Sequence, residues 1–250
     1  MSTRASLESQ LNNIPCEAED TEEMFWLRES DDYQSKVKLG NLLAAQYRFK
    51  DACEAYEAAA SVKATDSMLF ICLGGSYLSL YKYEQAKAAY DKAAALGAPV
   101  QSVSYPLGVL YYLKGEYAQS AETFAKCLPC GGELKIAVIY WHTLASYRAG
   151  IETTLLNEFT EDMEVGHHIA YKEAVMIFSG LKSYVSPTDE GAYTPGNPLD
   201  QAVFKYGVSV YCEHINDTKN QGLLLEETLQ CNAVWPSVSY LAAYNDNNNK

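Results

Sequence analysis

The dipeptide Leu-Gly recurs along this chain of 250 residues at a fixed interval of 34 residues, at Leu39-Gly40, Leu73-Gly74 and Leu107-Gly108. Self-similarity at a period of this length is typical of proteins built from stacked copies of one small structural unit. One unit cannot cover its own apolar face, so each copy has to pack on the next. The repeat therefore constrains the fold more strongly than composition does.

Four further columns fall into register when the three copies are aligned on this dipeptide. Aromatic residues stand ten and seventeen residues after each Leu, and small residues stand thirteen and twenty residues after it. The spacings of three, four and three residues follow the helical period, so the four positions of one copy share one face of a helix. The columns are Phe49/Tyr83/Tyr117, Ala52/Ala86/Ser120, Tyr56/Tyr90/Phe124 and Ala59/Ala93/Cys127.

These columns resemble the tetratricopeptide repeat, which has Leu-Gly in a first helix and Ala, an aromatic residue and Ala in a second. The resemblance implies an all-α fold, a right-handed superhelix of stacked helical hairpins, which is an α-solenoid. It also implies that the glycine lets the paired helix approach closely and that the aromatic ring fills the space between hairpins. Leu96–Pro99 carries the helix-stop signal that a repeat boundary requires.

The resemblance covers residues 33–134, and a fourth copy begins at Ile139–Gly150 if the loop near Gly131-Gly132 has gained one residue. Its second helix, roughly residues 151–163, lacks the Ala-aromatic-Ala column, so the fourth repeat is degenerate. Pro106 interrupts the first helix of the third copy. That helix either starts late, with Ser104 as its N-cap, or contains a kink.

The predicted organisation has three parts: an N-terminal segment with a capping helix (1–32), about four tetratricopeptide repeats (33–165) and a helical C-terminal region (166–250). Thr21–Ser30 predicts an amphipathic capping helix in which Met24, Phe25 and Leu27 cover the end of the stack.

The C-terminal region predicts a helix at 167–184, a Pro/Gly loop at 186–198, a divergent repeat and a last capping helix at 234–244. The divergent repeat is a hairpin of residues 199–214 and 221–231. The polar tail that follows the capping helix is expected to fray. This region either continues the superhelix or folds back into it.

Acidic residues outnumber basic ones by 32 to 19, which gives a net charge of −13. A nucleic-acid surface needs clustered Lys and Arg, so we expect no nucleic-acid partner. No run reaches the roughly 18 apolar residues of a membrane span, and the N-terminus lacks an apolar signal core. The seven cysteines are an odd number spread through helical segments, which indicates free thiols and a cytoplasmic location.

Two clusters could carry chemistry, Cys127/Cys130 and His167-His168. The cysteine pair ends a helix, where the dipole disfavours a thiolate, and a structural zinc site needs a second pair. The histidines belong to one Glu-x-x-His motif, whereas a di-iron bundle needs two. We therefore expect no catalytic residue, no metal ligand and no cofactor.

The resemblance implies that the first helix of each hairpin lines a peptide-binding groove. Family members that bind C-terminal Glu-Glu-Val-Asp tails clamp carboxylates with Lys and Arg, and only Asn41 matches that set here. The groove instead favours an apolar peptide or amphipathic helix, unless Tyr112 and Tyr147 pack against the chain itself. The expected groove residues are Asn41, Met68, Ile71, Leu78, Tyr105, Val109, Tyr112, Tyr140, Leu144, Tyr147 and Arg148.

These features together predict a non-enzymatic adaptor that binds a protein segment in its groove. A small cytosolic chaperone holding one specific client is the first alternative. A self-assembling repeat protein is the second.

Overall fold

The computed structural model describes residues 19–128 and 130–248, so Cys16 and the N-terminal stretch that is expected to lack a signal core lie outside the described residues. Within the described ranges the chain forms twelve α-helices and two short 3-10 helices, and no strand. The predicted all-α class is confirmed. The chain divides into two compact units, Met1–Leu110 and Tyr111–Lys250, with the boundary inside one helix.

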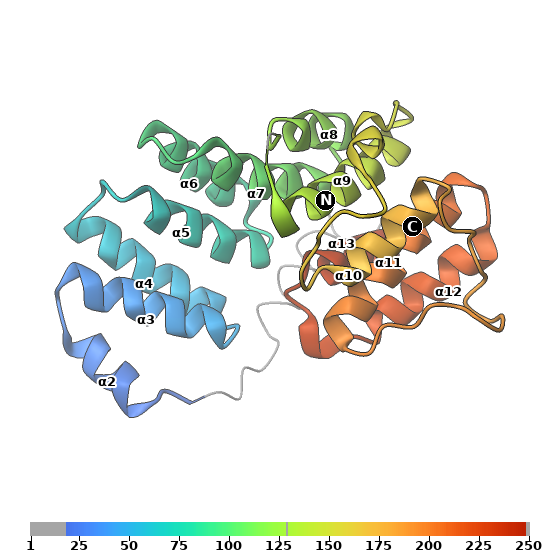
Figure 1. Cartoon of the computed structure of the whole chain (residues 1–250). Helices are drawn as coiled ribbons and strands as arrows, with labels where there is room; N and C mark the ends of the chain where they lie inside the picture. Colours follow the sequence, from blue (N-terminus) through green and yellow to red (C-terminus); the bar gives the residue numbers. More distant parts are fainter. Residues whose placement is uncertain (1–18, 129, 249–250) are drawn as a thin grey trace. The chain divides into compact units, whose positions relative to one another are not determined.

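The first unit is a series of helical hairpins (Figure 1). From α2 to α6, each helix contacts the next one along the chain, so α2 packs on α3 and α4 packs on α5. The helices are α2 (Glu22–Glu29), α3 (Tyr33–Ala45), α4 (Phe49–Val62), α5 (Ser67–Ser79), α6 (Tyr83–Ala95) and the first part of α7 (Val100–Leu113).

Capping residues set the starts of the first helices. Asp32 accepts a hydrogen bond from the backbone N–H of Ser35 at 3.0 Å, and Asp66 accepts one from Met68 at 2.9 Å. Each side chain satisfies an amide that lacks a partner in the first turn of its helix. The two caps are again 34 residues apart, so the repeat extends to the helix boundaries.

Glycine and tyrosine recur at the same spacing in the first two repeats, and they pack in the same way in both. The ring of Tyr56 lies on the α-carbon of Gly40, and the ring of Tyr90 lies on the α-carbon of Gly74. A β-carbon at either glycine would overlap the ring. The glycine thus admits the tyrosine of the paired helix, and both rings are almost completely buried in the unit.

The turn at the end of each first helix also repeats. Its αL residue is Tyr47 (φ 62°), Tyr81 (56°), Gly115 (79°), Gly150 (65°) or Asn216 (63°). In every case this residue donates to the carbonyl three positions earlier, and its successor donates to the carbonyl five positions earlier. This is the Schellman arrangement of a helix C-terminus. Gly150 comes one residue later than a 34-residue step from Gly115, as the extra loop residue predicts.

The second unit contains the last residues of α7 and all later helices. Its helix α9 contacts α8, α10 and α11, and α11 also contacts α12 and α13. The elements are α8 (Tyr117–Ala125), α9 (Gly132–Ala149), η1 (Thr154–Glu158), α10 (Ile169–Phe178), α11 (Pro198–His214), α12 (Thr218–Leu229), η2 (Asn232–Val234) and α13 (Val238–Asn248).

The fourth repeat differs from its prediction because residues 151–163 hold only η1 and no α-helix. Helix α10 instead packs on both α9 and α11, as a second helix of a hairpin would. Its Ala170 and Ala174 are fully buried and one helical turn apart, which allows close packing. The α11–α12 hairpin, with its Schellman turn at Asn216, has the form predicted for a divergent repeat.

Several predicted helix boundaries are wrong. Helix α7 starts at Val100 with Pro106 inside it, so the late start at Ser104 does not occur. Helix α10 ends at Phe178 rather than Tyr184, because Gly180 (φ 75°) turns the chain. The tail was expected to fray, but α13 extends to Asn248.

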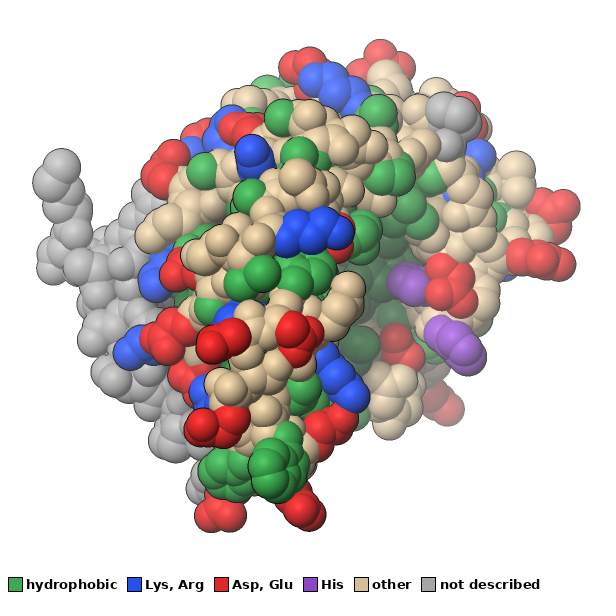
Figure 2. Space-filling view, turned by 90° about the vertical axis from the view of Figure 1, so that its left-hand side faces the viewer, with side chains coloured by type: hydrophobic (Ala, Val, Ile, Leu, Met, Phe, Trp, Pro, Cys, Tyr) green, Lys and Arg blue, Asp and Glu red, His purple; other side chains and the backbone are tan. Residues whose placement is uncertain are grey.

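The capping helix α2 covers the core with fewer residues than predicted. Thr21 caps it, and Met24 is 1% exposed and packs into the core with Leu27 beside it. The prediction that Phe25 helps to cover the end of the stack is wrong, since Phe25 is 60% exposed and the neighbouring Trp26 is 72% exposed. Figure 2 shows hydrophobic side chains projecting at the lower end of the view, over α2. None of the described helices has the length and apolar content to cross a membrane.

Candidate functional site

The predicted groove residues of the first unit lie on α3, α5 and α7. Asn41 is exposed, and its side-chain oxygen accepts a hydrogen bond from the Tyr56 hydroxyl at 2.7 Å. Met68 is 53% exposed, and Ile71 and Tyr105 are half-buried. These four residues remain accessible on the first helices of the repeats.

The groove prediction is wrong for five other residues, because the structure buries them and no partner could contact them. Leu78 and Val109 are 8% and 1% exposed, and both lie in the first unit. In the second unit the buried residues are Tyr112, Tyr140 and Leu144. In the second unit these side chains therefore pack against the chain itself, which was the alternative to an open groove.

Tyr140 of α9 is covered by α11. Its hydroxyl donates a hydrogen bond to the backbone carbonyl of Val203 at 2.6 Å. Its ring lies on the α-carbon of Gly207, where a β-carbon would overlap it. The same glycine–tyrosine packing that closes the hairpins of the first unit therefore joins two first helices in the second.

Arg148 lies at the centre of the buried polar groups of the second unit. Its guanidinium donates to both carboxylate oxygens of Asp246 at 2.6 Å, and it lies 3.1 Å from Glu213. The rings of Tyr112, Tyr117 and Tyr206 surround it at 5.4 to 5.9 Å, within range of a cation–π interaction.

This environment keeps Arg148 charged. Burial alone would lower the pKa of Arg148, but the nearby tyrosines and the Asp246 carboxylate raise it further than burial lowers it. Burial also raises the pKa of Tyr112 and of Tyr206, so both remain protonated and share a hydrogen bond at 2.9 Å. The last turn of α13 thus occupies a position where a bound carboxylate would neutralise Arg148.

Tyr147 is also held by the C-terminal helices. Its ring stacks on the His214 ring with centroids 4.0 Å apart and an angle of 16°. Its hydroxyl donates to the Phe178 carbonyl at 3.5 Å. Tyr147 and Arg148 line a recess of about 500 Å³ together with Glu213, His214 and Asp246.

The residues that cover the predicted groove were not among the predicted site residues. Asp246 was placed in a fraying tail, and Val203 and Gly207 carry no repeat signature. Asp246 lies 98 positions after Arg148, and no periodic pattern connects them. Their role could not be found from spacing along the chain.

The structure describes the surroundings of the two clusters that were considered for chemistry. Burial raises the pKa of the Cys127 thiol to about 12, the opposite of what a reactive cysteine needs. His168 and the backbone of His167 both contact Glu133, at 3.2 and 2.9 Å. Among the described residues, no group of three or more His, Cys, Asp or Glu side chains could hold a metal ion.

The 34-residue hairpins, the glycine–aromatic packing within them and the repeated turns define a tetratricopeptide-repeat fold and confirm the resemblance. No family model and no curated protein matches the sequence. The solved structure of YrrB, described as a TPR protein with an unusual peptide-binding site, is 13% identical over 91% of this chain and 98% of its own, with a TM-score of 0.47. The structure of the MamA protein is 18% identical over 77% of this chain and 85% of its own, with a TM-score of 0.45.

Proposed function

We propose that this chain is a non-enzymatic protein-interaction module that binds an apolar segment of a partner. The binding surface is the first-helix face of the first unit, formed by Asn41, Met68, Ile71 and Tyr105. The observations that carry the proposal are the exposure of Met68 on α5 and the exposed, oriented amide of Asn41 on α3. A flexible apolar side chain suits a variable apolar partner, and a positioned amide can bond the partner's backbone.

The burial of the predicted groove residues in the second unit limits the proposed binding surface to the first unit. Tyr112, Tyr140 and Leu144 support the fold rather than a partner, so the bound segment is shorter than a groove along four repeats would hold. The free cysteines among the described residues support a reducing, cytoplasmic location.

The test is selection of binding peptides from a random library against the whole chain, followed by affinity measurements on two variants. Met68→Ser should weaken the selected peptides by about tenfold, since burying a Met side chain contributes about 1.5–3 kcal/mol. Val62→Ser is the matched control, because Val62 is also 53% exposed but lies on α4, a second helix. Equal affinities of both variants would place the binding surface elsewhere.

Self-assembly is a second candidate function, and the exposed Phe25 and Trp26 favour it. These side chains lie on α2, the first of the described helices, and the ends of a solenoid need a polar cover. Light scattering over a range of concentrations would show a rising mass for the native chain. Replacement of both residues by Ser should abolish that rise, and a constant monomer mass in the native chain would exclude this function.

A further inference from the structure

The segment between α10 and α11, residues 179–197, is longer than ordinary helix connections. It is fastened to the helices at three places. The Tyr193 ring packs edge-on against Phe204 with centroids 4.8 Å apart, and Gln201 donates to the Pro195 carbonyl at 3.0 Å. Ser186 donates to the side chain of Asn220 at 3.3 Å. Long ordered loops of this kind are usually functional.

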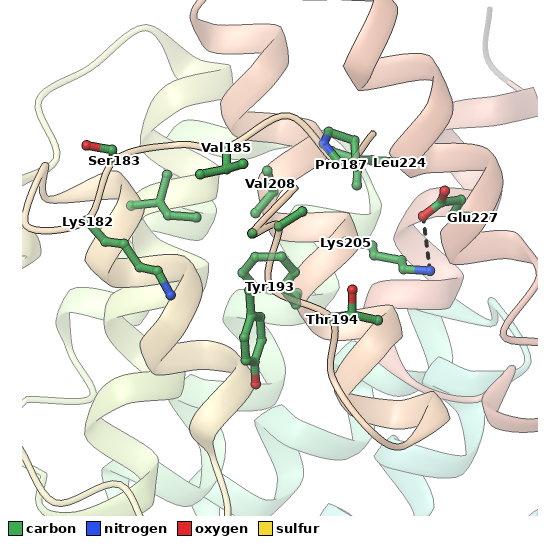
Figure 3. A pocket seen from close by; sticks show the side chains of 14 residues that line it. Lys182, Ser183, Val185, Pro187, Tyr193, Thr194, Lys205, Val208, Leu224 and Glu227 are labelled. Carbon is green, nitrogen blue, oxygen red and sulfur yellow. Dashed lines mark ion pairs between the residues drawn. The ribbon is translucent and has the colours of Figure 1, made fainter. Parts of the chain in front are cut away.

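The loop encloses a cavity of about 230 Å³ against α10, α11 and α12, seen from close by in Figure 3. Its helical side carries the buried apolar residues Ile177, Phe204, Val208 and Leu224, beside the charged residues Lys205 and Glu227. An apolar cavity of about 150 Å³ holds a benzene ring. This one therefore has room for a single ring or a short chain with a polar group attached.

The charged residues of the cavity wall are two lysines and one glutamate. Lys182 and Lys205 line it together with one carboxylate, Glu227, which lies 3.0 Å from the Lys205 ammonium. In Figure 3 the Lys182 side chain extends toward Tyr193, whereas the Lys205 side chain extends toward Glu227. Lys182 pairs outside the cavity wall with Glu173. Each lysine of the wall is therefore paired with one glutamate, and Glu227 is the only carboxylate among the described residues that line the cavity.

Each lysine can serve a ligand without leaving its glutamate. An ammonium group has three donors, and the ion pair with Glu227 or Glu173 uses one of them. The Thr194 hydroxyl on the loop adds a further donor. A ligand carboxylate can accept hydrogen bonds from these remaining donors, whereas a cationic ligand would face the two ammonium groups and a doubly charged anion would meet no net positive charge.

We propose that this cavity binds a small monocarboxylate with a compact apolar body. The apolar body packs on Phe204 and Val208, and the carboxylate accepts hydrogen bonds from Lys205 and Thr194, with Lys182 at the opposite side. This site lies wholly within the second unit and is separate from the peptide surface on α3 and α5.

The test compares three ligands with the same apolar body by titration calorimetry on the whole chain: 3-phenylpropionate, 3-phenylpropanol and 3-phenylpropylamine. The carboxylate should bind about tenfold more tightly than the alcohol, as expected for a hydrogen bond to a charged donor. The amine should bind more weakly than the alcohol. Equal affinities for acid and alcohol, a preference for the amine, or no binding of any of the three would overturn the proposal.

Variants locate the site. Lys205→Met should remove the preference for the acid over the alcohol, whereas Lys87→Met, which affects an exposed ion pair on α6, should leave it unchanged. Val208→Trp should fill the cavity and abolish binding of all three ligands. Ala192→Phe fills it from the loop side and serves if the core variant does not fold. Unchanged affinity in folded Lys205→Met and Ala192→Phe would place the ligand elsewhere and overturn the proposal.

Discussion

The ring of Tyr90 lies directly on the α-carbon of Gly74 and occupies the space that a β-carbon at residue 74 would need. The neighbouring Gly75 has open space around its α-carbon. Gly74→Ala should therefore lower the free energy of unfolding by about 1–3 kcal/mol through overpacking. Gly75→Ala should leave it unchanged or raise it by up to about 1 kcal/mol, because alanine favours the helix.

Urea denaturation of both variants checks this contrast between adjacent positions of one helix. A similar loss of stability in the two would mean that the helix tolerates no change there and that the Tyr90 contact is not the cause.

The hydroxyl of Tyr140 has a partner, whereas that of Tyr90 is buried without a hydrogen-bond partner among the described residues. Tyr140→Phe should lower the free energy of unfolding by about 1–2 kcal/mol, because it removes the bond to the Val203 carbonyl. Tyr90→Phe keeps the same ring and should be neutral or stabilising. The urea midpoints of the two variants measure the difference, and a larger loss in Tyr90→Phe would contradict the packing described here.

Asp246 neutralises Arg148, whose side chain is only 10% exposed. Asp246→Ala should lower the free energy of unfolding by about 3 kcal/mol, because it leaves a buried cation with less compensation. Asp91→Ala breaks the exposed ion pair with Lys87 and should change the free energy of unfolding by less than about 1 kcal/mol.

The double variant Arg148→Met/Asp246→Leu separates charge from packing. It should be more stable than Asp246→Ala, because no unpaired charge remains in the core. If Asp246→Ala unfolded no more easily than Asp91→Ala, α13 would not be held by this ion pair.

Asp20 precedes α2 and contacts Arg28 and Arg48. Hydrogen bonds from Arg28, and then from Arg48, lower the pKa of Asp20 from 3.8 to about 2. Because the folded pKa is lower, these contacts stabilise the fold above about pH 4 and lose their effect as the pH falls toward 2. Urea titrations of the native chain and Asp20→Asn should show a stability difference at pH 6 that shrinks toward pH 3. A difference independent of pH would exclude the charge as its source.

The repeated part of the fold could be predicted from the sequence because each unit interacts with its neighbours along the chain. Gly40 and Tyr56 are 16 positions apart, and the same spacing recurs at Gly74 and Tyr90. Local spacing of this kind is visible in the sequence alone. The caps at Asp32 and Asp66 follow the same logic.

The candidate site was harder to predict, because contacts between distant segments decide its exposure. Tyr112 and Tyr140 occupy positions typical of a groove, but Tyr206, Val203 and Gly207 cover them. No α-helix directly follows Gly150, and α10 packs against α9 in its place. No residue pattern in the sequence predicts this change. Met68 and Asn41 belong to the regular repeats, where the helix face could be predicted.

The ion pair between Arg148 and Asp246 can form only after the ribosome has made both residues. The two residues are 98 positions apart, and a ribosome adding about 5–20 residues per second needs about 5 to 20 seconds to travel between them. During this interval a nascent chain carries the Arg148 charge and the Tyr112 ring without their final partners. Until Asp246 has been made, the second unit therefore exposes a charged and aromatic surface to which chaperones can bind. The finished protein buries this surface.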